Sequence, residues 1–242
     1  MIDRAQDAGI VRLLVPGWDV ASSEAALELG DRYPSLIAAA VGVHPHHASE
    51  VDEAAWGRLD SLVADPRTVA VGEIGLDFFR NLSPPDVQRD ALARQLDLAQ
   101  RSGKPVLVHD RDAHREVTEA LLAWRQASRS ETPASTAPAA GVLHCFSGDA
   151  EMAAALAAVG FLVSFALPVT FRSADGPRAA AAQLADEAIL VETDAPWLGP
   201  GPDRRNEPIT ALRVAAELAR LRGTSPDAIA GIANANLARL LH

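Results

Sequence analysis

Histidines and carboxylates recur in this sequence directly after short apolar runs. Five such places read "AAVGVHPHH", "VAVGEIGLD", "PVLVHDRDA", "GVLHCFSGD" and "LVETDAP". In a parallel α/β protein such runs are buried strands, and the groups that follow them gather at the carboxyl edge of the sheet. Neutral imidazole with carboxylate suits Zn, Mn, Fe or Co, and Mg fits where carboxylate and water dominate. The pattern therefore predicts a divalent metal site at this edge.

Three of these residues are the candidate metal ligands. Glu73 follows Gly72 between the apolar stretches "VAV" and "IGL". An unpaired charge is costly in such a setting, which favours metal ligation over a solvated loop carboxylate. His109 ends "PVLVH" and His144 ends "GVLH", although a lone histidine in such a strand fits a satisfied core residue equally well. A shared ion requires these three side chains to converge.

Other polar residues near the strand ends have supporting or alternative interpretations. Asp110 can orient an imidazole through its second nitrogen or cap the next helix. Glu192 is expected to point into the fold or to support a ligand from behind. Asp77 is interpreted as a loop or helix-start residue, and Asp194 as a metal-site carboxylate or a turn residue before proline. Cys145 has no base beside it in sequence, which leaves a nucleophilic role unsupported.

Substrate contacts are predicted from a histidine cluster and one arginine. The stretch "GVHPHHA" has three histidines within four positions, and His44 and His46 are placed at the rim in contact with substrate. Arg111 is the candidate for binding a phosphate, because a guanidinium group can donate two parallel hydrogen bonds to phosphate oxygens. A salt bridge to Asp110 or Asp112 is the alternative for this arginine.

Strand and helix patterns alternate along the whole chain. Runs rich in Val, Ile and Leu predict strands at 11–16, 36–43, 68–72, 105–109, 141–144, 161–165 and 188–192. A short helix opens the chain, and further helical patterns cover 20–32, 51–64, 84–102, 111–127, 149–159 and 177–186, with two more helices in 207–240. This alternation implies one domain, 1–242, with a parallel sheet covered by helices. The low-complexity stretch 127–140 is predicted as a mobile surface loop.

Composition excludes several function classes. The formal net charge of −10 argues against a broad basic face for duplex DNA, so a phosphate-bearing substrate needs a local cation. A single cysteine excludes an internal disulfide and a cysteine-based zinc site. The sequence shows no signal peptide and no stretch long enough to span a bilayer. We therefore expect a cytoplasmic protein with no membrane association and no stable protein partner.

Taken together, "GVHPH", "GEIGLDF", "VHDRDAH", "HCFSG" and "ETDAPWL" resemble the signature blocks of the TatD family of metal-dependent deoxyribonucleases, within the amidohydrolase-like barrels. The blocks occur in the family's order, and "RNEP" matches a further block that adds Asn206 to the substrate-binding candidates. The resemblance implies a TIM-type (β/α)8 barrel whose first strand ends in a His-x-His pair. Seven strands are predicted here and no such pair, so we expect a chain that begins after that strand; a doubly wound open sheet also tolerates seven strands.

The resemblance also implies two metal positions bridged by Glu73. One position uses Glu73, His109 and His144, while the other needs the absent histidine pair together with Asp194. We therefore expect one firm site for Mg, Mn or Zn and a second site that is weak or empty. The expected reaction is hydrolysis of phosphodiester bonds near the 3′ end of single-stranded DNA, with Asp194 accepting a proton from water. The alternatives are amide or lactone hydrolysis on the same barrel and a catalytically impaired remnant.

Overall fold

The computed structural model describes residues 1–127, 138–200 and 205–241, and most of the low-complexity stretch lies outside the described residues. All seven predicted strands are confirmed, and they pair in parallel in chain order. Their bounds are β1 (Leu13–Pro16), β2 (Ile37–Val41), β3 (Thr68–Asp77), β4 (Val106–Arg111), β5 (Gly141–Leu143), β6 (Phe161–Phe165) and β7 (Ile189–Val191).

The predicted helices are also present. The α-helices are α1 (Ile2–Asp7), α2 (Val20–Arg32), α3 (Glu53–Ala64), α4 (Pro85–Ser102), α5 (His114–Ala127), α6 (Ala150–Ala158), α7 (Asp175–Gln183), α8 (Ala211–Arg222) and α9 (Pro226–Leu240). Short 3-10 helices are η1 (Pro45–Glu50), η2 (Leu167–Thr170), η3 (Asp186–Ala188) and η4 (Pro208–Thr210). Along the described residues, no helix combines the length and apolar character that a membrane span requires.

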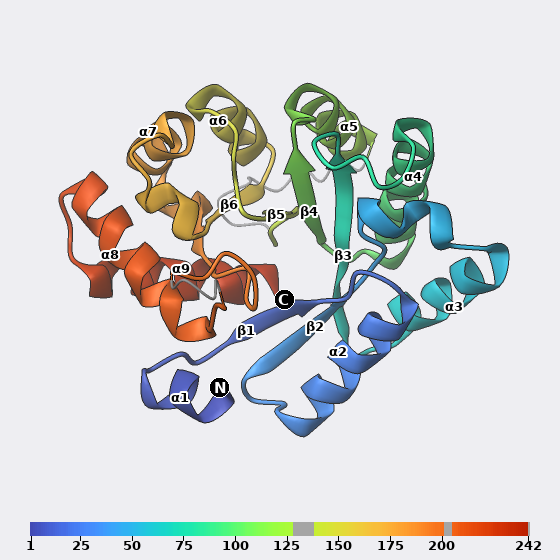
Figure 1. Ribbon diagram of the computed structural model, residues 1–242, viewed down its shortest axis with the longest axis horizontal. Helices are drawn as coiled ribbons and strands as arrows, with labels where there is room; N and C mark the ends of the chain where they lie inside the picture. The colour runs from blue at the N-terminus through green and yellow to red at the C-terminus, as the bar shows by residue number, and fades with distance from the viewer. Residues whose placement is uncertain (128–137, 201–204, 242) are drawn as a thin grey trace.

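The sheet curls into a partly closed barrel with the helices around its outer side (Figure 1). This is the TIM-type architecture predicted from the sequence, with seven strands in the part of the chain that the structure describes. Within the described residues, the edge strands β1 and β7 pair only with β2 and β6 respectively. Between these edges lies a cavity of about 330 Å³, lined by residues of both strands and of α8 and α9. The cavity reaches His144 and Asp194 at the carboxyl edge.

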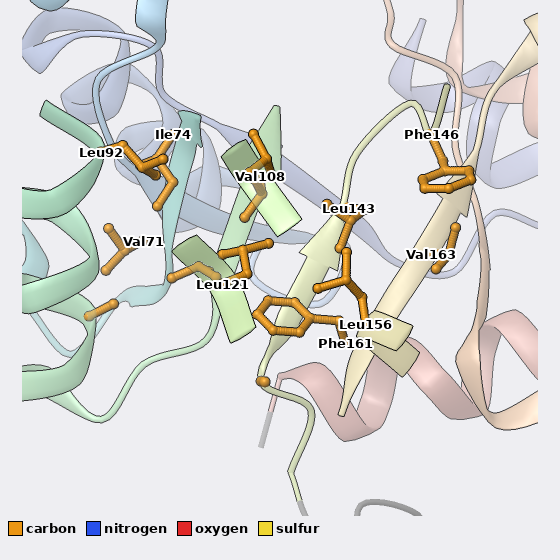
Figure 2. Close-up of a cluster of buried hydrophobic side chains, with 14 of the residues drawn as sticks. Val71, Ile74, Leu92, Val108, Leu121, Leu143, Phe146, Leu156, Phe161 and Val163 are labelled. Carbon is orange, nitrogen blue, oxygen red and sulfur yellow. The ribbon is translucent and has the colours of Figure 1, made fainter. Parts of the chain in front are cut away.

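The main core lies between the sheet and the outer helices. Side chains alternate between the two faces of a strand, so Val106 and Val108 of β4 face this core while Leu107 belongs to a separate cluster. Figure 2 shows Val108 beside Leu121 of α5, and Leu156 of α6 among the side chains of neighbouring strands. The alternation predicts which residues beyond each strand turn inward.

Two glycines let β3 approach its neighbour closely. A Cβ atom at Gly72 would lie 2.5 Å from the Cβ atom of Leu107, and one at Gly75 would overlap the carbonyl oxygen of His109. Gly75 also has φ +144°, a backbone conformation that other residues rarely adopt. These glycines flank Glu73 and therefore fix how closely that carboxylate approaches β4.

Replacing Gly75 by alanine is expected to destabilise the fold by at least about 2 kcal/mol, since the new methyl group meets backbone and the φ angle becomes strained. Thermal and denaturant unfolding measure this change. The matched control is Gly57→Ala in α3, where nothing lies within 4 Å of the added carbon. The control is expected to be neutral or stabilising by up to about 1 kcal/mol. Equal unfolding midpoints for the two variants would contradict the close approach of β3 and β4.

Candidate metal centre

The candidate site lies where the inward-facing series on several strands changes from apolar to polar. Leu107 of β4, Val142 of β5 and Leu190 of β7 belong to the smaller cluster on the inner face of the sheet. The residues two positions further along these strands are His109, His144 and Glu192. Because alternate residues share a face, these polar groups continue the inner series just beyond the apolar layer. The candidate reactive groups thus lie at the carboxyl ends of these strands, just beyond the apolar layer.

Glu73 is the centre of this group. Its Oε1 atom lies 3.0 Å from Nδ1 of His109, 3.5 Å from Nε2 of His44 and 3.7 Å from Nε2 of His144. The structure therefore brings together the three residues that the sequence analysis proposed as ligands. Among the described residues, the donor atoms that all lie within 4.8 Å of one another belong to His44, Glu73 and His109, and His144 approaches this group through its 3.7 Å contact with Glu73.

Each candidate imidazole ligand has a second carboxylate behind it. His144 Nδ1 lies 2.9 Å from Glu192 Oε1, which is the supporting contact expected from the sequence. His109 Nε2 lies 3.3 Å from Asp77 Oδ2, which also lies 2.7 Å from His46 Nε2. Carboxylates in this position fix the tautomer and orientation of a ligand imidazole and raise its basicity.

Asp77 is the site residue that the sequence analysis missed. It was interpreted as a loop or helix-start residue, but β3 extends to Asp77 and the side chain is fully buried. Its Oδ1 accepts the backbone N–H of Arg80 at 2.7 Å, and its own backbone N–H donates to Gln88. The two-residue period of a strand could have placed Asp77 at the site, because residues four apart on a strand share a face and Glu73 lies four residues earlier.

The segment that carries His46 is held by a serine that precedes α4. The N-cap residue is Pro84. Ser83 is buried instead, where its hydroxyl donates to the carbonyl of His46 and accepts the backbone N–H of Ser49. Since His46 contacts Asp77 with Nε2, this serine helps to set the position of both side chains.

The charges in the centre favour a cation. Burial alone would raise the pKa of Glu73, but the imidazoles of His144, His109 and His44 hold it well below its usual range. Burial disfavours the imidazolium of His109, yet its contacts with Asp77 and Glu73 prevail and raise the pKa of His109 to about 9. His144 likewise has a raised pKa, since Glu192 and Glu73 outweigh its burial. The pocket thus stabilises positive charge, which fits a divalent ion.

The loop after β7 places Asp194 at the edge of the centre. Its Oδ1 lies 3.5 Å from His144 Nε2, and its backbone has φ +58°. The left-handed region is uncommon for residues other than glycine, and aspartate and asparagine are among those that tolerate it. This backbone conformation turns the chain so that the carboxylate of Asp194 faces His144.

Asn206 holds this loop in place through hydrogen bonds to its backbone. Its side chain is buried, Nδ2 donates to the carbonyl of Thr193 at 2.5 Å, and Oδ1 accepts the backbone N–H of Glu207 at 2.9 Å. Its own backbone N–H donates to the carbonyl of Pro196. The predicted contact with substrate is not supported by this placement, because both ends of the amide are occupied by backbone. Asn206 positions the loop instead.

Asp110 and Arg111 differ in part from expectation. Asp110 lies two residues after Val108, which faces the outer core, so its side chain also points outward. Its carboxylate pairs with Nδ1 of His114 at 2.8 Å and does not make the predicted contact with a candidate ligand imidazole. Arg111 is exposed, and its guanidinium carbon lies 4.0 Å from the ring centroid of Phe79. Among the described residues it makes no salt bridge, so the alternative pairing with a neighbouring aspartate is absent.

Cys145 is held as a thiol beside the centre. Burial raises the pKa of Cys145 to about 12, and its backbone N–H donates to Glu192 Oε1 at 3.1 Å. A protonated thiol is a weak nucleophile. Its contribution is therefore the backbone contact that orients Glu192.

Comparison with known proteins gives the family. The family model described as TatD related DNase matches residues 1–242. The chain belongs to this family. An uncharacterised metal-dependent hydrolase of Bacillus subtilis, YabD, is 34% identical over 99% of this chain and 91% of its own length. The Erwinia billingiae protein named 3′-5′ ssDNA/RNA exonuclease TatD is 36% identical over 99% of this chain and 91% of its own length.

A solved structure of a TatD homologue has the same fold as this chain. The TatD homologue YjjV of Escherichia coli superposes with a TM-score of 0.87 at 30% identity, covering 99% of this chain and 89% of that one. The protein is thus a metal-dependent hydrolase of the TatD type on a TIM-type barrel. Imidazole and carboxylate donors gathered around a largely buried, ionised Glu73 fit the divalent metal that this class requires.

Replacing Asp77 by asparagine is expected to weaken divalent-metal affinity about 10- to 100-fold, because the variant loses the charge that orients and polarises the His109 imidazole. Isothermal titration with Mn²⁺ measures the affinity. The matched control is Asp52→Asn, an aspartate at the N-cap of α3 on the exterior. It is expected to leave affinity unchanged. Parent-like affinity in Asp77→Asn would show that this carboxylate does not act on the metal centre.

Proposed function

We propose that the protein removes nucleotides from the 3′ end of single-stranded nucleic acid, using one firmly bound divalent ion. The observation that carries the proposal is the meeting of Glu73, His109 and His144 at the edge of the barrel where β4 ends in the exposed Arg111. The Erwinia relative named as an exonuclease on single-stranded DNA and RNA supports this substrate class. Mg, Mn or Zn suits the mixed donor set.

The ion is held by Glu73, His109 and His144 in this proposal. A divalent ion supplies Lewis acidity, which polarises a phosphoryl oxygen and makes a nearby water more acidic. Asp194 contacts only His144 among these three, at 3.5 Å. One contact is a poor basis for a second ion, so a second position is expected to be weak or empty.

Asp194 acts as the proton acceptor in this proposal. It is the partly exposed carboxylate of the centre, and it lies on the loop that follows β7. Glu192 and Asp77 are instead each occupied by an imidazole. A carboxylate that contacts the centre from one side and solvent from the other is suited to take a proton from an attacking water and release it.

His44 is suited to donate a hydrogen bond to a phosphate oxygen. Its Nδ1 accepts the backbone N–H of His46 at 3.1 Å, so the neutral ring carries its proton on Nε2. Burial lowers the pKa of His44 to about 3 despite the nearby Glu73, which keeps the ring neutral at physiological pH. Binding an ion through Nε2 would require the proton to move to Nδ1, where it would point at the backbone N–H of His46, which is also a donor. His44 therefore fits substrate binding better than metal ligation.

His46 has a different role from the one predicted. Its Nε2 lies 2.7 Å from Asp77 Oδ2 and is committed to that contact. We therefore assign His46 to holding Asp77, and through it His109, while Arg111 remains the cation for the substrate phosphate. The acidic chain makes a local cation necessary for a phosphate-bearing substrate.

The test is digestion of a 5′-fluorescein-labelled single-stranded oligonucleotide with Mn²⁺, Mg²⁺ or Zn²⁺. We expect stepwise shortening from the 3′ end, no reaction with EDTA, and protection by an inverted 3′-terminal nucleotide. A blunt duplex of the same sequence is expected to be cut more slowly. Hydrolysis of small amides or lactones without cleavage of oligonucleotides would replace this function by the alternative one. Inactivity on both panels would identify an impaired enzyme.

A further inference from the structure

Exposed aromatic side chains gather at one edge of the molecule. Of the six Phe, four Trp and one Tyr in the chain, four are exposed, by 50% to 69%. These four, which we call the aromatic rim, are Trp18, Phe79, Phe171 and Trp197. They follow β1, β3, β6 and β7 respectively, so all four lie at the carboxyl edge that carries the metal centre. Large aromatic side chains are normally buried, so this one-sided exposure indicates a surface that binds something.

Two members of the aromatic rim are tied to the centre by backbone hydrogen bonds. The carbonyl of Trp18 accepts the backbone N–H of His44 at 2.9 Å, and the neighbouring carbonyl of Gly17 accepts that of Glu73 at 2.8 Å. The backbone N–H of Trp197 donates to the carbonyl of Asp194 at 2.7 Å. The two indole rings therefore sit on the segments that flank the reacting groups, one from each open edge of the sheet.

Arginines accompany the two phenylalanines of the aromatic rim. Arg111 packs against the Phe79 ring, and Arg80 and Arg172 each directly follow a rim phenylalanine in sequence. All three arginines are exposed, and none forms a salt bridge with a described carboxylate. On the outer helices, by contrast, many arginines are paired, as Arg89 is with Glu116 at 2.6 Å. Unpaired guanidinium groups beside exposed rings are suited to phosphates that lie next to bases.

We propose that the aromatic rim is a stacking surface for the unpaired bases of a single strand, with Arg80, Arg111 and Arg172 on its phosphates. The inference rests on the proposed nuclease function and adds how the strand is held. Stacking uses the π face that every base has, so binding tolerates any sequence. In a duplex those faces are covered by neighbouring bases except at the outer face of each terminal pair, so a duplex offers too few free faces to occupy the aromatic rim. Three phosphate contacts predict a slope of about −2 for log affinity against log salt concentration.

The test compares two probes that share a phosphate backbone: fluorescein-labelled (dT)10 and the same decamer built from abasic sugars. Binding is followed by anisotropy in EDTA, which prevents turnover. The parent is expected to bind (dT)10 more tightly than the abasic probe. Trp197→Leu and Phe171→Leu keep apolar bulk but remove the π face, and each is expected to weaken (dT)10 binding about 5- to 100-fold while leaving the abasic probe unchanged. Trp197→Phe is expected to restore most of the loss.

Tyr33→Leu, at the opposite edge of the barrel beyond α2, is the matched control and is expected to bind as the parent does. Equal affinity of the parent for the two probes, or parent-like (dT)10 binding by both leucine variants, would overturn the stacking surface. If the parent nevertheless digests oligonucleotides, the proposed function stands without it. If the parent neither binds nor digests them, the proposed function itself fails.

Discussion

Replacing Glu73 by glutamine is expected to lower the rate of hydrolysis by roughly three orders of magnitude. Glutamine keeps the size of the side chain but removes the negative charge that three imidazoles face within 3.7 Å. Without that charge the remaining donors are neutral nitrogens, so affinity for Mn²⁺ is expected to fall at least about 100-fold. Titration calorimetry measures the affinity, and oligonucleotide digestion at saturating metal measures the rate.

The control for this variant is Glu116→Gln, which removes a surface carboxylate paired with Arg89. An exposed pair of this kind contributes little to stability, and its loss is expected to leave both readouts unchanged. Circular dichroism establishes that Glu73→Gln is folded. A folded Glu73→Gln protein with parent-like metal affinity would show that the convergence of Glu73, His109 and His144 does not form the metal site.

Sequence reasoning reached this centre because a parallel sheet gathers its strand ends at one edge. Each of His109 and His144 could be placed there once its strand was recognised, without knowing any contact. The inward direction follows too, since Leu107 precedes His109 by two residues and Val142 precedes His144 by two. These placements could be derived because the side chains alternate regularly along short, uninterrupted apolar strands.

Sequence reasoning failed where that regularity was interrupted. Gly72 and Gly75 break the apolar run of β3, so the predicted strand ended at residue 72 although the structure carries it to Asp77. Those glycines are needed for close approach to β4, and that need depends on a neighbour distant in sequence. The orientation of Asn206 could not be predicted for another reason. Its position in a family block placed it near the site, but only tertiary contacts show that its amide points into the loop.

Strand phase also separates two carboxylates that the sequence analysis treated alike, one on β4 and one after β7. Asp110 and Glu192 both come directly after apolar stretches, yet Asp110 faces His114 on the outer helix and Glu192 faces His144 in the centre. Counting in steps of two from Val108 and from Leu190 gives opposite faces for them. Residue type alone could not separate the pair, whereas strand phase does.

Replacing Asp194 by asparagine is expected to lower kcat about 10²- to 10⁴-fold, the usual contribution of a positioned proton acceptor. Metal affinity is expected to change much less, because Glu73, His109 and His144 remain. The substitution is expected to leave the backbone unchanged, because Asp194 has φ +58° and asparagine adopts this left-handed conformation as readily as aspartate does. The loop is therefore preserved while the charge is lost. Single-turnover digestion at saturating Mn²⁺ isolates the chemical step.

Asp112 provides a control with the same backbone constraint. It has φ +56°, is exposed, and follows β4 at the same edge of the sheet. Asp112→Asn therefore repeats the change of charge and the left-handed conformation without touching His144, and it is expected to keep kcat within about twofold of the parent. A parent-like rate in Asp194→Asn would remove this carboxylate from the chemistry. A loss of metal binding equal to the loss of rate would instead make Asp194 a ligand, since a pure proton acceptor leaves the ion in place.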